Sequence, residues 1–120
     1  MLVRLAPSAR RDIVAILAWT HENFGPRQTQ RYATLIQTAI EELARDPKRA
    51  GSEQRAELAT GCRTYHLFHA RKNVGARGNR VRNPRHFLLY RSPETGVIEI
   101  ARVLHDSMEL VEHLPEEYRA

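Results

Sequence analysis

The segment His86-Phe-Leu-Leu-Tyr-Arg91, Ser92-Pro-Glu-Thr-Gly96, Val97-Ile-Glu-Ile-Ala-Arg-Val-Leu-His105 holds the densest apolar run of the chain. Its first arm is aromatic and aliphatic, its second is rich in β-branched residues, and the connection contains a proline and a glycine. This composition predicts an antiparallel β-hairpin at the centre of a sheet. Neither arm alternates strictly, so both sheet faces are expected to be partly covered. The residues expected to be buried are Phe87, Leu89, Ile98, Ile100 and Leu104.

The residues before this hairpin predict a strand and a first helix. Leu2–Leu5 is short and alternating, which indicates a strand at or near a sheet edge. Pro7 suits the first turn of a helix, because the N–H that it lacks would be unpaired there. Apolar residues then recur at three- and four-residue steps as far as Thr20, and this stripe should face the sheet. Trp19 falls off the stripe and is interpreted as a large residue closing the edge of the core.

A second helix is predicted to return along the first. Asn23-Phe-Gly-Pro26 contains a helix stop and a helix start, which together indicate the turn of a helical hairpin. A cleaner apolar stripe runs from Tyr32 to Leu43, and Asp46-Pro47 ends the helix.

The rest of the chain predicts loops, one more strand and a short helical turn. Residues 48–61 are expected to form a loop with a turn of helix at 55–59, and Cys62–His69 a strand. Glycines, asparagines and a proline make 71–85 a loop or a long hairpin tip. Met108–His113 is expected to form a short helical turn, and 115–120 a frayed acidic tail.

Together these elements predict an α+β fold in two layers. The order is β-α-α-β-β-β, with the helical hairpin packed on one face of an antiparallel sheet and the other face open. The length of 120 residues fits a single domain covering 1–120, with a basic extension at 71–85.

The positive charge of the chain is concentrated in one segment. The net charge is +5, yet residues 62–92 hold eight Lys or Arg and no Asp or Glu. Such a field favours a phosphate-bearing or acidic partner over a neutral one. Cys62 is the single cysteine, which excludes an internal disulfide. No apolar run is long enough to span a bilayer and no secretion signal begins the chain, so we expect a cytoplasmic protein without a membrane partner.

Several motifs resemble the RelE/ParE toxin superfamily, and most closely its ParE branch. They are Leu5–Ile13, the Phe24-Gly-Pro turn, Tyr32 with Leu35, Phe87–Arg91 and Val97–Met108, and the similarity covers about residues 3–114. The resemblance implies the toxin of a type II toxin–antitoxin pair, silenced by a small antitoxin, which we expect to be a ribbon-helix-helix protein. We expect no cofactor. ParE-like members inhibit DNA gyrase, whereas RelE-like members cut mRNA in the ribosome.

The residues favour the gyrase branch and exclude neither the nuclease nor a non-toxic member that binds only its antitoxin and operator DNA. RNA cleavage needs an acid, a base and cations beside the reacting phosphate. Phe87 stands where the nuclease branch has an arginine, and the segment after His105 is acidic where the nucleases are basic. The residues that would serve a nuclease are His105, Arg85, Arg102 and Arg63.

Two of these residues have structural interpretations that stay open. His105 is better explained as a hydrogen-bonding residue at a strand end than as an acid or base. Arg102 fits a partly buried ion pair with an acid such as Glu109 or Glu112 as well as it fits a target-binding role. His66 and His69 differ by three positions on the predicted strand, so they should point to opposite faces and form no metal pair.

A gyrase inhibitor needs only a binding surface. The extension 71–85 is longer than the turn of typical ParE-like sequences, and it is expected to contact DNA phosphates, an acidic protein face or the antitoxin. The candidate residues for binding the target or the antitoxin are Arg71, Lys72, Arg77, Arg80, Arg82, Arg85, Tyr90, Arg91, Arg102 and His105.

Overall fold

The computed structural model describes residues 1–75, 80–108, 113 and 114. One long helix and a short 3₁₀-helix accompany a five-stranded sheet, which makes an α+β fold as predicted. In chain order the elements are β1 (Leu2–Leu5), α1 (Pro7–Arg45), β2 (Ser52–Gln54), β3 (Arg63–His66), η1 (Leu67–Asn73), β4 (His86–Glu94) and β5 (Val97–His105). The predicted helical turn at Met108–His113 and the acidic tail lie largely outside the described residues.

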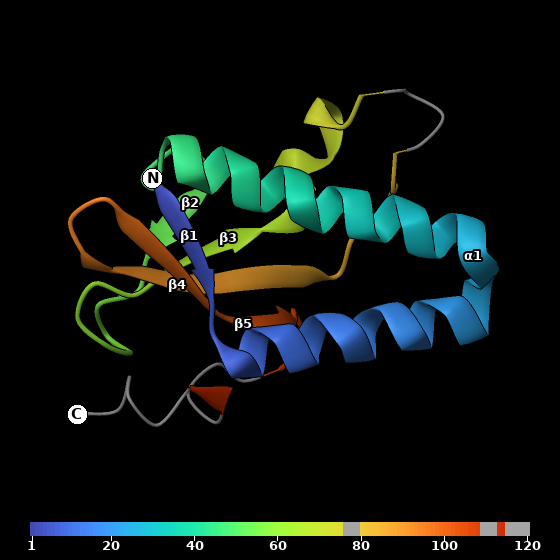
Figure 1. Cartoon of the computed structure of the whole chain (residues 1–120), viewed down its shortest axis with the longest axis horizontal. Coiled ribbons are helices and arrows are strands. Elements are labelled where there is room, and N and C mark those ends of the chain that lie inside the picture. The colour runs from blue at the N-terminus through green and yellow to red at the C-terminus, as the bar shows by residue number, and fades with distance from the viewer. Residues whose placement is uncertain (76–79, 109–112, 115–120) are drawn as a thin grey trace.

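Helix α1 consists of two arms that meet at Gly25. The backbone of Gly25 is non-helical, with φ 84° and ψ 178°, a conformation that only glycine adopts readily, and Pro26 begins the second arm. The arms run side by side in opposite directions over the sheet (Figure 1). The helical hairpin expected from Asn23–Pro26 is therefore present.

The sheet is mixed, which corrects the prediction of a wholly antiparallel sheet. Its strand order is β1-β5-β4-β3-β2, and the central β4–β5 hairpin is antiparallel as expected. Strand β1 lies at one edge and pairs parallel with β5, Leu2 opposite Val97 and Leu5 opposite Ile100. The alternation of a four-residue strand reveals which side chains share a face but not the direction of its neighbour, so the sequence could not specify this pairing.

Two further boundaries differ from the prediction. Residues 52–54, expected in a loop, form the edge strand β2 against β3. The strand predicted for Cys62–His69 ends at His66, whose Nδ1 accepts a hydrogen bond from the backbone N–H of Phe68 at 3.0 Å and so caps η1. The turn expected at 55–59 is present, since the N–H groups of Leu58 and Ala59 both donate to the carbonyl of Arg55.

The core has two parts, one on each sheet face. The larger part joins both arms of α1 to the sheet through residues such as Leu35, Leu43, Leu88 and Ile100. The smaller part contains Cys62, Leu89, Ala101 and Leu114, with Leu58 and Ala59 packed against it. The face expected to be open is thus partly covered, as the hairpin pattern indicated. All five residues predicted to be buried are at most 9% exposed: Phe87, Leu89, Ile98, Ile100 and Leu104.

Candidate functional site

A concave apolar cleft lies between the two arms of α1 and the adjoining ends of β4 and β5. Its volume is about 680 Å³. Trp19 and Phe24 stand at its rim with 59% and 62% of their surface exposed, and their rings meet edge to face at 5.7 Å. Large exposed aromatic side chains beside a cleft commonly mark a protein-binding surface. The main lining residues are Ile16, Trp19, Phe24, Tyr32, His86 and Met108.

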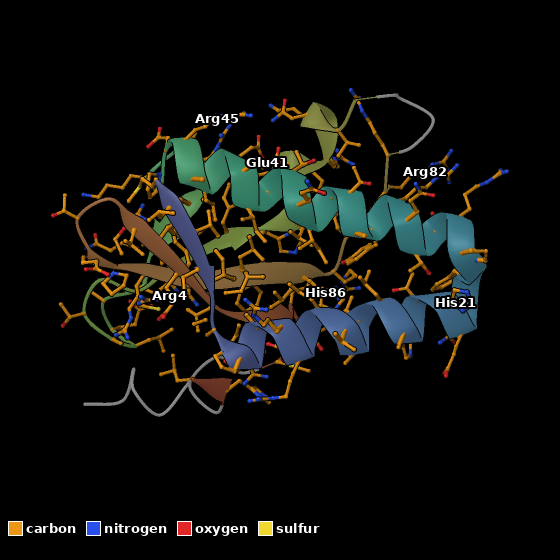
Figure 2. The ribbon with its side chains drawn as sticks, viewed as in Figure 1. Arg4, His21, Glu41, Arg45, Arg82 and His86 are labelled. Carbon is orange, nitrogen blue, oxygen red and sulfur yellow. The ribbon has the colours of Figure 1, made fainter. Side chains whose placement is uncertain are left out.

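The polar wall of the cleft is a chain of hydrogen bonds that begins at Tyr32. Its hydroxyl accepts from the backbone N–H of Arg85 at 3.2 Å and shares a hydrogen bond with Nδ1 of His86 at 2.6 Å. Burial, followed by the neighbouring His105, lowers the pKa of His86 to about 4. Burial also raises the pKa of Tyr32 to about 12. Both side chains are therefore neutral near pH 7, and Figure 2 shows His86 directed into the space between the arms of α1 and the sheet.

His105 lies opposite His86 on the neighbouring strand. The two rings are 5.2 Å apart and nearly perpendicular. Nδ1 of His105 accepts from the backbone N–H of Ser107 at 3.1 Å and lies 2.7 Å from the Ser107 hydroxyl. This contact fits the structural interpretation of His105 as a hydrogen-bonding residue at a strand end.

Asp106 follows β5 and binds Arg85, a cation that lines the cleft. Both of its carboxylate oxygens accept from the guanidinium of Arg85, at 2.9 to 3.1 Å, and Oδ2 lies 3.0 Å from Nε2 of His66. The hydrogen bonds from Arg85 are the main reason that the pKa of Asp106 falls to about 2. Near neutral pH this carboxylate is ionised, and it offsets the charge of Arg85.

A smaller recess opens on the opposite sheet face. Its volume is about 280 Å³, and His66, His69, Phe87 and Asp106 are among its lining residues. Within the described part of the chain, no group of three or more His, Cys, Asp or Glu side chains is arranged to hold a metal ion. Both histidines line this recess, so the expectation that they point to opposite faces is wrong. The strand ends at His66, and His69 belongs to η1.

The remaining residues of the hypothetical nuclease set lie apart and have structural partners. Arg102 forms two hydrogen bonds with the carboxylate of Asp12, at 2.7 and 2.9 Å, and a third with the carbonyl of His113. The ion-pair interpretation of Arg102 therefore fits, but the acid is on α1, whereas Glu109 and Glu112 lie outside the described residues. Nε of Arg63 donates to the Ser52 hydroxyl at 2.7 Å.

Two further candidate residues also have internal contacts. Tyr90 is 1% exposed, and its hydroxyl donates to the carbonyl of Pro47 and contacts the hydroxyl of Ser52. Arg91 lies 3.6 Å from a carboxylate oxygen of Glu99. Arg91 thus links β4 to the neighbouring strand β5, whereas Tyr90 links β4 to β2, two strands away, and to the loop before β2.

The other candidates gather at the base of the basic extension. The guanidinium of Arg71 donates to the carbonyl of Arg82 at 2.9 Å, and that of Arg80 donates to the carbonyl of Lys72 at 2.8 Å. Arg82 projects outward beside the second arm of α1 (Figure 2). Arg77 lies outside the described residues.

Sequence reasoning missed the rim of the cleft. Trp19 was expected to close the edge of the core, but it lies mostly exposed, so that interpretation is wrong. The signal was present in its spacing, because a residue off the apolar stripe of an amphipathic helix points away from the packed face. Asp12 carried no such signal, since its partners Arg102 and Val103 are 90 and 91 residues away in sequence.

The family model of the ParE toxin of the type II toxin–antitoxin system parDE matches residues 3–110. No curated protein matches the chain. Across the part of the chain that the structure describes, no helix combines the length and apolar character needed to cross a membrane.

Proposed function

The chain belongs to the ParE toxin family of type II toxin–antitoxin systems, and we propose that it inhibits DNA gyrase by binding and is neutralised by a cognate antitoxin. Inhibition of this kind needs a surface and no bond-breaking residues. The proposal places the toxin in the cytoplasm, where its target works.

One observation carries this proposal: the cations that an RNA-cleaving site would need are already bound by other groups of the protein. Arg85 is held by Asp106, Arg102 by Asp12 and Arg63 by Ser52, so these guanidinium groups serve to fasten the fold. Stabilising the charge on a reacting phosphate requires cations directed at one point and free to bind it. Phe87 is 9% exposed and supplies no charge to the sheet face.

The alternative function is a RelE-like, ribosome-dependent mRNA endonuclease. One observation favours it: two imidazoles, of His86 and His105, lie 5.2 Å apart beside Arg85 at the edge of a cleft. Histidines can exchange protons with a reacting hydroxyl near neutral pH. The lowered pKa of His86, however, makes it a poor proton donor at pH 7.

The apolar cleft supports the antitoxin part of the proposal. Exposed apolar surface of this kind is costly in water unless a partner covers it. An amphipathic antitoxin segment with aromatic or aliphatic anchors fits such a groove between helices. Covering Trp19, Phe24 and Met108 would hide the most exposed apolar part of the cleft.

Two assays run side by side test the proposed function. Purified toxin is added to DNA gyrase in a supercoiling assay, and in parallel to a translation reaction whose mRNA is analysed by primer extension. We expect inhibition of supercoiling and an uncut mRNA. Codon-linked cuts with normal supercoiling would establish the nuclease instead. Adding purified antitoxin should restore supercoiling.

A further inference from the structure

The base of the extension 71–85 carries cations that no carboxylate of the described chain offsets. Of the eight Lys and Arg in residues 62–92, Arg85 and Arg91 have acidic partners. Among the described residues no Asp or Glu oxygen lies within 4.0 Å of the four cations at the base of the extension: Arg71, Lys72, Arg80 and Arg82. A cluster of unpaired cations creates a concentrated positive potential at that place.

This cluster is held in position by the fold. Hydrogen bonds run in both directions between its two flanks, from Arg71 to the carbonyl of Arg82 and from Arg80 to the carbonyl of Lys72. The guanidinium of Arg71 also lies 4.0 Å from the centre of the Phe68 ring, a favourable cation–π contact. Pre-ordering of this kind reduces the entropy lost when a ligand is bound.

We propose that Arg71, Lys72, Arg80 and Arg82 form a basic surface that binds the phosphate backbone of duplex DNA. Phosphate oxygens are bound mainly by arginine and lysine side chains, and arginine matches their geometry best. This inference goes beyond the proposed function, because the toxin would contact the duplex itself, with or without gyrase.

The composition of the basic surface favours DNA over an acidic protein. The core of a protein interface is usually depleted in charged residues as a class, although arginine itself is common there, and it contains aromatic and other apolar anchors. Here Ala70 and Val74 are at most 4% exposed, Val81 is partly buried against the core, and Phe68, 46% exposed, lies beneath the guanidinium of Arg71. The flanks rise away from the sheet past α1 (Figure 1). A protruding surface rich in charge suits a phosphate backbone.

The test is a binding assay with two matched double variants. The purified full-length toxin is titrated into a fluorescein-labelled DNA duplex of mixed sequence, and anisotropy is followed at several KCl concentrations. The first variant, K72Q/R82Q, removes two exposed cations whose side chains make no hydrogen bond or ion pair with described residues. The control, R10Q/R11Q, removes two exposed cations from the start of α1. Both variants lose the same charge, and circular dichroism checks that each is folded.

We expect K72Q/R82Q to weaken duplex binding roughly tenfold and to lower the slope of log K against log salt by about 2, one for each lost phosphate contact. The R10Q/R11Q variant should stay close to wild type. Equal weakening in both variants would overturn the proposal, because binding would then follow overall charge. Tighter binding of labelled poly-glutamate than of the duplex would overturn it in favour of an acidic protein. Supercoiling assays on the same proteins report on gyrase separately.

Discussion

Asp12 takes the place of a strand beside the second half of β5. Strand β1 ends at Leu5, and the backbone beyond Ile100 then lacks a neighbour on that side. The Ser8 hydroxyl donates to the carbonyl of Ala101 at 2.7 Å, and the Asp12 carboxylate accepts from the N–H of Val103 at 2.9 Å. The first turns of α1 thus satisfy backbone groups that an open sheet edge would expose to pairing with another chain.

His86 should make the stability of the toxin depend on pH. Its pKa is about 4 in the folded chain against an ordinary value of 6.5. Between these values the unfolded chain binds a proton that the native chain excludes, so acidification favours unfolding. We expect the free energy of unfolding to fall between pH 6.5 and pH 4, and the fall to be smaller in His86→Leu.

Urea titrations of both proteins at a series of pH values measure this effect. The informative quantity is the difference in pH dependence, because the substitution also removes a hydrogen-bond partner of the Tyr32 hydroxyl and lowers stability at every pH. Identical pH profiles for the two proteins would show that His86 is not the responsible group.

At the scale of single residues, the sequence could predict burial but not the partners of the polar side chains. The apolar pattern of its strand was enough to predict that Phe87 is buried, and the single cysteine was enough to exclude an internal disulfide at Cys62. Both residues are at most 9% exposed. The hydrogen bonds of Arg102 and Tyr90 to distant residues follow from tertiary packing, which no local period encodes. Charge alone brought Arg85 and Arg102 together as candidates, whereas the structure pairs each with its own acid.

At the scale of elements, Gly25 sets the angle between the two arms of α1. Its φ of 84° and ψ of 178° lie where side chains with a Cβ are strained. We expect Gly25→Ala to lower the free energy of unfolding by about 1–3 kcal/mol, the usual cost of such a backbone conformation. Chemical denaturation monitored by circular dichroism measures the change.

Gly75→Ala provides the matched control. A Cβ added at either glycine meets nothing within 4 Å, but only Gly25 of the two has a positive φ. Any difference between the variants therefore reports backbone strain and not crowding. If both variants lost the same free energy of unfolding, the positive φ at residue 25 would add no cost for alanine.

Elements with strong periodicity were predictable, and short ones were not. The stripe from Tyr32 to Leu43 and the β4–β5 hairpin appear where their patterns indicated. Strand β2, with the sequence Ser-Glu-Gln, has no apolar residue to reveal it and exists because β3 offers a free edge. The strand ends at His66 because its side chain caps η1. The aromatic and apolar residues that follow His66 look like a continuing strand, so the sequence did not indicate this end.

At the scale of the whole molecule, the apolar cleft and the basic surface share one segment. Val81 and Asn83 line the cleft, while Arg80 and Arg82 belong to the basic surface. A partner seated in the cleft therefore lies close to these cations. On the proposed function, an antitoxin with apolar anchors and acidic flanks would cover both surfaces at once, and the proposed neutralisation would then also remove the proposed DNA contact.

This arrangement can be tested with a variant that loses antitoxin binding but keeps its action on gyrase. A glutamate in place of Trp19 puts a charge into the apolar rim of the cleft, and burying that charge beneath a partner is costly. We expect Trp19→Glu to weaken antitoxin binding by at least about tenfold, which corresponds to about 1.4 kcal/mol, while inhibition of gyrase persists.

Val14→Glu is the control, since Val14 is also an exposed apolar residue of the first arm but does not line the cleft. Calorimetric titration with antitoxin and the supercoiling assay report the two properties. Loss of gyrase inhibition with normal antitoxin binding would assign the cleft to the target, because a charge at the rim then blocks the toxin's action and leaves its neutralisation intact.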